Sequence, residues 1–257
     1  MGLLYTEGKI MYDQNAFQAS IEMWFAAFCL IATACLMVGR DDQTKTRKAL
    51  MLLQLNNAIY MAGEGTAYFL IGGGENGINY WGTRIANFCA YAGEFAMLIA
   101  TTFYIRAKII DGMEEKGEVK KMYWHLPMTA LGLIALGMLI VNQIYPLFYY
   151  FDESNIYHRA DYYLVSQAIG LIMIIYPLVA LFIYRKHVSR FTGMAITIFA
   201  IAPLIAMAYQ YFHYGLSFTG FATTGAVLLL FVTYELDYSR KMELQNKKKF
   251  ETLVYKQ

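Results

Sequence analysis

Two apolar stretches of the chain each carry a narrow stripe of polar side chains at helical spacing. In the first stretch, roughly residues 50–71, the polar positions are Gln54, Asn57, Glu64 and Tyr68. At the start of and within the second, roughly residues 85–105, they are Arg84, Asn87, Tyr91 and Glu94. Intervals that add up from three and four residues place each set on one face of a helix. Such side chains can bind a cation or polar ligand, relay a proton, or join helices by hydrogen bonds.

The rest of both stretches is largely apolar, so the polar stripe is the narrow one. We expect the polar face to be buried and the apolar surroundings to be lipid. Composition agrees, because the chain is 58% hydrophobic and only 16% charged, against about 25% charged in soluble domains. Three cysteines lie inside apolar runs and are expected to act as small hydrophobic side chains, not as a disulfide framework or metal site; they are Cys29, Cys35 and Cys89.

The fold class expected is all-α, a bundle of seven transmembrane helices. A span needs about 20 predominantly apolar residues. The runs that qualify are roughly residues 17–38, 50–71, 85–105, 124–145, 162–184, 191–213 and 218–236.

Basic residues set the expected orientation. Of the 21 lysines and arginines, all but Lys9, Arg84 and Arg159 fall on one side of the seven runs. The N-terminus is therefore expected outside and the C-terminus in the cytoplasm, in a plasma or bacterial inner membrane. Residues 1–16 lack the features of a cleaved signal peptide and should form an extracellular tail. Residues 17–236 should form the membrane domain, and 237–257 either a cytoplasmic signalling helix or a basic tail near anionic lipid.

Glu64 and Arg84 should lie at similar depth, since their helices are antiparallel neighbours. They are expected either to form an ion pair that locks the helices or to share the polar wall of a ligand pocket open to the outside. Glu94, nearer the middle of the membrane, could bind a cation, relay a proton, or hydrogen-bond Asn57 or Gln54.

Other polar residues lie at a depth suited to the same pocket. His213 could sense pH, and the aromatic-rich segment around residues 145–159 could cap the pocket. Each of these side chains also has a plain interpretation as helix–helix or interfacial contact. The complete set of candidate ligand-binding residues is Glu64, Tyr68, Arg84, Asn87, Tyr91, Glu94, Asn142, Arg159, Gln167, Gln210 and His213.

Several functions are disfavoured by what the sequence lacks. The last run has no lysine for a retinal Schiff base. Metalloprotease, nucleophile-elbow and phosphate-loop motifs are missing. The four histidines have no metal-ligand spacing, and the basic residues follow membrane topology. We therefore expect no enzyme activity, no cofactor, no metal and no nucleic-acid partner.

Residues 17–240 resemble the seven-helix sensor region at the N-terminus of bacterial diguanylate cyclases (GGDEF proteins) and histidine kinases. The matching segments are Ala67-Tyr68-Phe69-Leu70 followed by Gly72-Gly73, then Arg84-Ile85-Ala86-Asn87-Phe88, Asn155-Ile156-Tyr157-His158-Arg159, residues 203–210, and Tyr214-Gly215-Leu216-Ser217. The resemblance implies an acidic residue near the position of Glu64 and a last span that continues into a cytoplasmic helix and an output domain. No cyclase or kinase domain follows here, so we expect a module cut from a longer protein or a stand-alone relative that needs a partner.

The function expected is that of a bacterial signal receptor module. A small extracellular ligand would bind between the second, third, fifth and sixth spans and shift the population of two helix arrangements. The seventh span would pass the change to a cytoplasmic output domain or partner protein, possibly within a homodimer. A small-solute transporter or ion carrier is the main alternative, although no internal repeat is visible. A lipid-modifying enzyme is a third.

Overall fold

The computed structural model describes residues 2–38, 44–71, 77–118, 121–212 and 217–254. Within those ranges the chain is all-α apart from one small hairpin. The α-helices are α1 (Gly2–Met37), α2 (Lys45–Leu70), α3 (Ile78–Glu114), α4 (His125–Val141), α5 (Tyr163–Ile183), α6 (Arg190–Phe212) and α7 (Phe218–Val254). The remaining elements are the antiparallel strands β1 (Tyr149–Phe151) and β2 (Tyr157–Arg159), and the 3₁₀ turn η1 (Arg185–His187).

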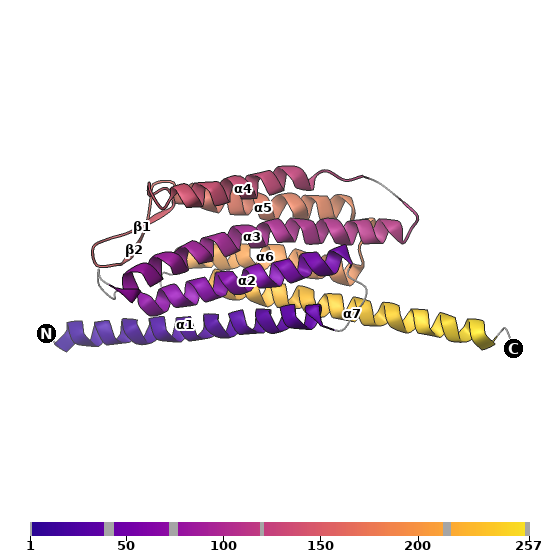
Figure 1. Cartoon of the computed structure of the whole chain (residues 1–257), viewed down its shortest axis with the longest axis horizontal. Coiled ribbons are helices and arrows are strands. Elements are labelled where there is room, and N and C mark those ends of the chain that lie inside the picture. The colour runs from indigo at the N-terminus through magenta and orange to yellow at the C-terminus, as the bar shows by residue number, and fades with distance from the viewer. Residues whose placement is uncertain (1, 39–43, 72–76, 119–120, 213–216, 255–257) are drawn as a thin grey trace.

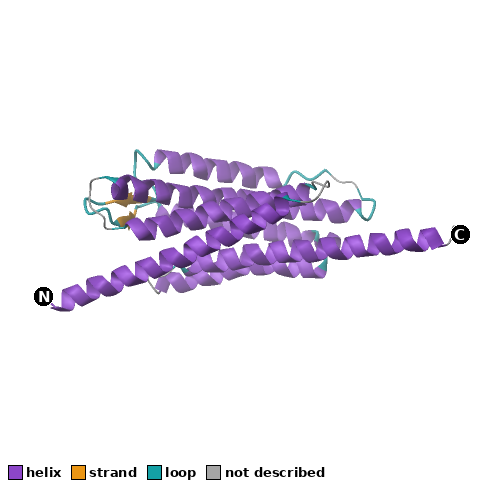
Figure 2. Cartoon of the chain, turned by 60° about the horizontal axis from the view of Figure 1, so that its bottom comes forward, coloured by secondary structure: helices purple, strands orange, loops and turns teal. Residues whose placement is uncertain are grey.

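The helices lie side by side in one elongated bundle, and two of them project from opposite ends (Figure 1). The N-terminal part of α1 extends beyond the bundle at one end, and the C-terminal part of α7 extends beyond it at the other (Figure 2). The residues expected to form an N-terminal tail are thus helical from Gly2 and continuous with the first apolar run. The C-terminal segment continues the last helix without a break.

Five helices are long and apolar enough to cross a membrane, which makes the chain a multi-pass membrane protein by length and composition. They are α1 from Gln14, α3, α5, α6 and α7. Of the other two, α4 has 17 residues, and α2 carries the polar stripe together with three basic residues in its first turn. At 37 residues, α3 is about 55 Å long, well beyond a hydrocarbon core of about 30 Å.

Glycines bring α2 and α3 into close contact. A Cβ atom at Gly63 would lie 2.6 Å from the Ala90 nitrogen, and one at Gly93 would lie 2.7 Å from the Tyr60 nitrogen. No side chain fits at either position, so the two backbones pack directly, as small residues allow in membrane helices. This contact determines which side chains of the two helices can face each other.

Two apolar clusters fill the bundle. One surrounds the end from which α7 projects and includes Leu53, Tyr104 and Leu230. The other is aromatic, lies under the hairpin and includes Phe95, Phe148 and Met173. Large apolar side chains are also widely exposed on the bundle surface, for example Leu164 and Ile183 at 70% each. Exposure of this kind suits a lipid-facing surface.

Candidate functional site

Buried acidic and amide side chains from three helices meet near the end of the bundle that carries the hairpin. We call this the carboxylate cluster; it consists of Gln18, Glu22, Tyr60, Glu64, Glu94 and Ser217. The Ser217 hydroxyl, directly before α7, donates a hydrogen bond to Glu64 Oε1 at 2.6 Å. The Gln18 amide nitrogen donates to Glu22 Oε1. Glu64 also interacts electrostatically with Tyr60, Glu22 and Glu94.

The cluster leaves several buried oxygen atoms without a hydrogen-bond partner among the described residues. Gln18 is 1% exposed and Glu22 is fully buried, yet Gln18 Oε1, Glu22 Oε2 and Glu64 Oε2 make no hydrogen bond. Further along α2, the same holds for Gln54 Oε1 and Asn57 Oδ1. All five atoms are oxygens, which in ionised carboxylates and amides can only accept hydrogen bonds. An unmet buried acceptor costs free energy, so this region favours an added donor or cation.

Two glycines leave room for these side chains. A Cβ at Gly65 on α2 would lie 3.1 Å from Glu22 Cβ on α1. A Cβ at Gly220 on α7 would lie 3.1 Å from Glu64 Oε2 and 2.6 Å from Met61 Cε. Both helices therefore approach the carboxylates with bare backbone.

The expected ion pair between Glu64 and Arg84 is replaced by two separate contacts. Arg84 Nη1 donates to Asn155 Oδ1 at 2.7 Å, and its guanidinium lies 3.5 Å from the centre of the Tyr80 ring. Asn155, at the hairpin turn, adopts a left-handed φ of 58° and is fully buried against α3. The turn therefore holds the Arg84 side chain through Asn155. Glu64 instead accepts a hydrogen bond from the Ser217 hydroxyl.

The amides of α2 donate hydrogen bonds to α1 and α7, and not to Glu94, although a bond to Gln54 or Asn57 is one of the three roles predicted for that carboxylate. Gln54 Nε2 donates to the Val227 carbonyl at 2.9 Å, and Asn57 Nδ2 donates to Thr224 Oγ1 at 3.0 Å and to Cys29 Sγ at 3.2 Å. The close glycine packing leaves no space between α2 and α3 for such bonds, which is why the amides turn the other way. Within the described part of the chain, Asn87 donates only to the carbonyl of Thr83 on its own helix.

The hairpin covers the aromatic end of α3. The Tyr91 and Tyr157 hydroxyls are 2.8 Å apart, and the Tyr91 ring stacks on that of Tyr149 with centroids 5.1 Å apart. Tyr68 interacts electrostatically with Tyr157 as well as with Glu64 and Glu22. Tyr68 therefore lies within electrostatic reach of both the hairpin and the carboxylate cluster.

The other predicted site residues serve the hairpin or lie apart. Asn142 Oδ1 accepts hydrogen bonds from the backbone of the segment entering β1, including Phe148 N at 2.6 Å, so it fixes the base of the hairpin. The Arg159 guanidinium lies 4.5 Å from the centre of the Tyr163 ring. Gln167 is half-buried on α5. His213 and the side chain of Gln210 lie outside the described residues.

A hydrogen bond between His158 and Asp152 stabilises the hairpin turn. His158 Nε2 lies 2.8 Å from Asp152 Oδ2, and the Ile156 backbone amide donates to Asp152 Oδ1 at 2.9 Å. These hydrogen bonds, the one with His158 first, lower the pKa of the Asp152 carboxyl, because they stabilise its charged form.

A second polar group lies at the opposite end of the bundle. Lys108 Nζ of α3 lies 3.3 Å from Asp237 Oδ2 of α7, and both side chains are mostly buried. The Thr192 hydroxyl of α6 donates to the same Asp237 oxygen, and Lys108 Nζ lies 5.4 Å from the centre of the Tyr234 ring. We call Lys108, Thr192 and Asp237 the α7 latch, since they fasten α7 where it leaves the bundle.

Sequence reasoning missed Gln18, Glu22 and Ser217, and it read Lys108 only as a topology signal. One signal could have found the first two. Glu22 is the single charged residue in the run 17–38, and Gln18 precedes it by one helical turn. A carboxylate inside a span is a site candidate by default.

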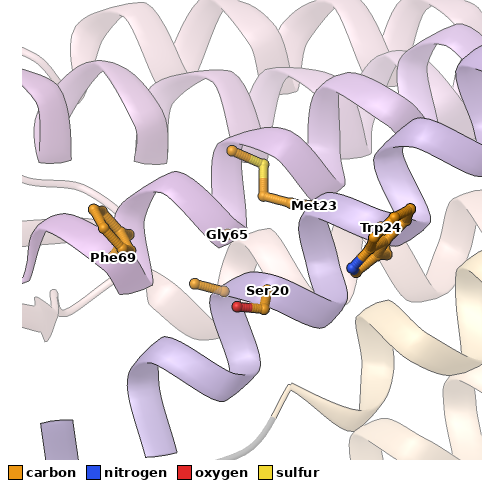
Figure 3. A pocket seen from close by; sticks show the side chains of 6 residues that line it. Ser20, Met23, Trp24, Gly65 and Phe69 are labelled. Atoms are coloured by element: carbon orange, nitrogen blue, oxygen red, sulfur yellow. The ribbon is translucent and has the colours of Figure 1, made fainter. Parts of the chain in front are cut away.

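A groove of about 530 Å³ lies beside the cluster, between α1 and α2. It is lined by Ala19, Ser20, Met23, Trp24, Gly65 and Phe69. Figure 3 shows Gly65 between the rings of Trp24 and Phe69. The groove is on a different side of α2 from the pocket expected among the second, third, fifth and sixth spans.

Comparisons with known proteins add no assignment to this geometry. No protein-family model matches the sequence, and no curated protein matches it. Among the described residues, no group of three or more histidine, cysteine, aspartate or glutamate side chains could hold a metal ion.

Proposed function

We propose that the chain is a bacterial transmembrane receptor module, similar to the sensor regions of diguanylate cyclases and histidine kinases. Seven helices would span the cell membrane, with the N-terminus outside and the projecting end of α7 in the cytoplasm. The distribution of basic residues supports this orientation. All lysines and arginines between residues 239 and 252 lie on the exposed end of α7.

The observation that carries the proposal is the continuity of α7. Ser217, at its start, holds Glu64 of the carboxylate cluster. Asp237, further along the same helix, belongs to the α7 latch, and residues 239–252 beyond it are exposed. An unbroken helix transmits a shift at one end to the other, so a change at Glu64 would alter the exposed extension.

The extension would act on an output domain or a partner protein, within a dimer of two parallel α7 helices. Apolar side chains remain exposed there at Met242, Leu244 and Phe250. Binding that favours one of two helix arrangements would shift their populations by its differential affinity.

The test is cysteine cross-linking of the extension in native membranes. Single cysteines at positions 239–252 are introduced in a chain with Cys29, Cys35 and Cys89 replaced. Cross-links that recur every three or four positions are expected, with yields that change in Glu64→Gln, because this variant removes the charge at the cluster. A flat pattern that Glu64→Gln leaves unchanged would refute the receptor proposal.

An ion carrier is the second candidate, supported by the unpartnered acceptors that continue from Glu64 to Asn57 and Gln54. A row of acceptors across a membrane could pass a cation. Uptake of a monovalent cation by vesicles that contain the purified chain, lost in Glu94→Gln, would favour the carrier.

A further inference from the structure

We infer that the carboxylate cluster binds a primary ammonium group, and that its natural ligand is a small amphipathic amine with an apolar tail. The inference deepens the receptor proposal by naming the class of ligand. The binding itself follows from the contacts around Gln18, Glu22 and Glu64 and does not require a signalling role.

The unpartnered atoms of the cluster are all hydrogen-bond acceptors. Gln18 Oε1, Glu22 Oε2 and Glu64 Oε2 are buried acceptors without donors. The unpartnered amide oxygen of Gln18 is evidence for a ligand that does not depend on the two glutamates. Its amide is 1% exposed, and its nitrogen is engaged with Glu22, which leaves its oxygen beside the carboxylates. A ligand here must supply donors and positive charge.

The number of donors needed points to a primary amine. An alkylammonium group presents three N–H donors and one positive charge on a single atom, which matches three acceptors. A quaternary ammonium has the charge but no N–H donor. The guanidinium of Arg84, which could have served internally, is held by Asn155 and Tyr80.

The groove beside the cluster offers space for an apolar tail. Gly65 lines the groove, and a Cβ at the same residue would lie 3.1 Å from Glu22 Cβ. Gly65 therefore lies against both the groove and Glu22, and Met23 Cγ lies 3.5 Å from the same Cβ position. Its rings, Trp24 and Phe69, are 64% and 67% exposed, and its volume of about 530 Å³ is within the usual range for small-molecule sites.

Depth in the membrane fits an amphipathic ligand. The apolar run of α1 begins near residue 17, and Glu22 lies about 8 Å further along the helix, at about 1.5 Å per residue. Glu64 lies about 9 Å before the end of α2 at Leu70 by the same rise. Charged groups on apolar chains settle at such a depth, with the chain in the apolar region.

The test measures binding of n-hexylammonium to the full chain in lipid nanodiscs by titration calorimetry. The comparison ligands have the same tail: n-hexyltrimethylammonium, which lacks N–H donors, and 1-hexanol, which lacks the charge. Saturable binding of n-hexylammonium is expected, with both comparison ligands at least about tenfold weaker, since hydrogen bonds to charged groups contribute that much. Equal binding of all three, or no saturable binding of the amine, would overturn the inference.

Variants locate the site. Glu22→Gln and Glu64→Gln should each weaken n-hexylammonium binding at least about tenfold. The matched control is Glu153→Gln, which removes an exposed carboxylate from the hairpin turn and should leave affinity unchanged. Trp24→Ala changes an exposed side chain of the groove, so the fold should persist while affinity for the hexyl tail falls several-fold. Unchanged affinity in Trp24→Ala and both glutamate variants would overturn the placement.

The outcome is separable from that of the receptor proposal. The cross-linking response of α7 to Glu64→Gln needs no added amine. Loss of amine binding with an intact cross-linking response would overturn the ligand class and leave the receptor. Amine binding with an unresponsive α7 would leave the site and overturn the receptor.

Discussion

The two polar groups that α7 touches differ in how completely they are paired. At the latch, Asp237 has Lys108 and Thr192 as partners. At the carboxylate cluster, Glu64 has the hydroxyl of Ser217 as a hydrogen-bond donor but shares its surroundings with two more carboxylates. At the latch the carboxylate of Asp237 is paired with the cation of Lys108. The carboxylate cluster has no cation among its members. The difference suggests that the latch holds the helix, whereas the cluster is ready to bind.

The largest expected effect is at the latch. Lys108→Ala leaves Asp237 buried without its cation, and breaking such a pair costs about 3–5 kcal/mol. We expect the free energy of unfolding in detergent to fall by about 3 kcal/mol, since both side chains keep some exposure. The control is Lys241→Ala, whose pair with Glu115 is exposed and should contribute at most about 1 kcal/mol. Equal losses would show that the latch is an ordinary surface pair.

Replacing an acidic side chain of the cluster should raise the free energy of unfolding, whereas Lys108→Ala should lower it. Glu22→Gln keeps the size of the side chain and its place beside Gln18 but replaces a buried acidic neighbour of Glu64 by a neutral amide. We expect the free energy of unfolding to rise by about 1–2 kcal/mol, because substitutions that remove a destabilising functional arrangement commonly stabilise a protein by this amount. A loss as large as that of Lys108→Ala would mean that the cluster is as fully paired as the latch.

A smaller effect tests the space beside Glu64. In Gly220→Ala the new methyl group would press on Met61 Cε and Glu64 Oε2. We expect a several-fold weaker affinity for n-hexylammonium with little change in thermal stability, because the Met61 side chain can shift. Gly225→Ala is the matched control on the same helix, since a Cβ there meets nothing within 4 Å. It should stabilise the helix by about 1 kcal/mol and leave affinity unchanged. The same affinity in both variants would contradict the proposed position of the ammonium group.

The smallest effect is expected outside the membrane, at the hairpin. The folded structure lowers the pKa of Asp152, so its contribution is present above the ordinary value of about 3.9 and is lost as pH falls through the folded value. Amide hydrogen exchange at Ser154 and Ile156, corrected for the intrinsic rate, should therefore quicken below about pH 4. In Asp152→Asn the extra acceleration should vanish. Protection that is independent of pH in the unmodified chain would show that the Asp152 carboxylate does not stabilise the turn.

The sequence predicted the helical class, because apolar period and length are local properties, and it left residues 237–257 open between a continuing helix and a basic tail. It also assigned Glu64, Tyr68 and Tyr91 to one candidate pocket, which the aromatic segment around residues 145–159 could cap. It did not predict their partners. Gly63 and Gly93 bring two backbones together, and this contact, which depends on tertiary packing, turns Gln54 and Asn57 away from Glu94. The left-handed turn at Asn155 likewise takes Arg84 from Glu64.

The most direct test of the account is the response of the exposed end of α7 to the charge at Glu64. Spin labels at positions 114 and 245, both exposed, report the distance between the end of α3 and the α7 extension in a cysteine-free chain. The account predicts a shifted distance distribution in Glu64→Gln and an unchanged one in Glu153→Gln. Identical distributions in the unmodified chain and Glu64→Gln would show that the cluster and the extension are not coupled.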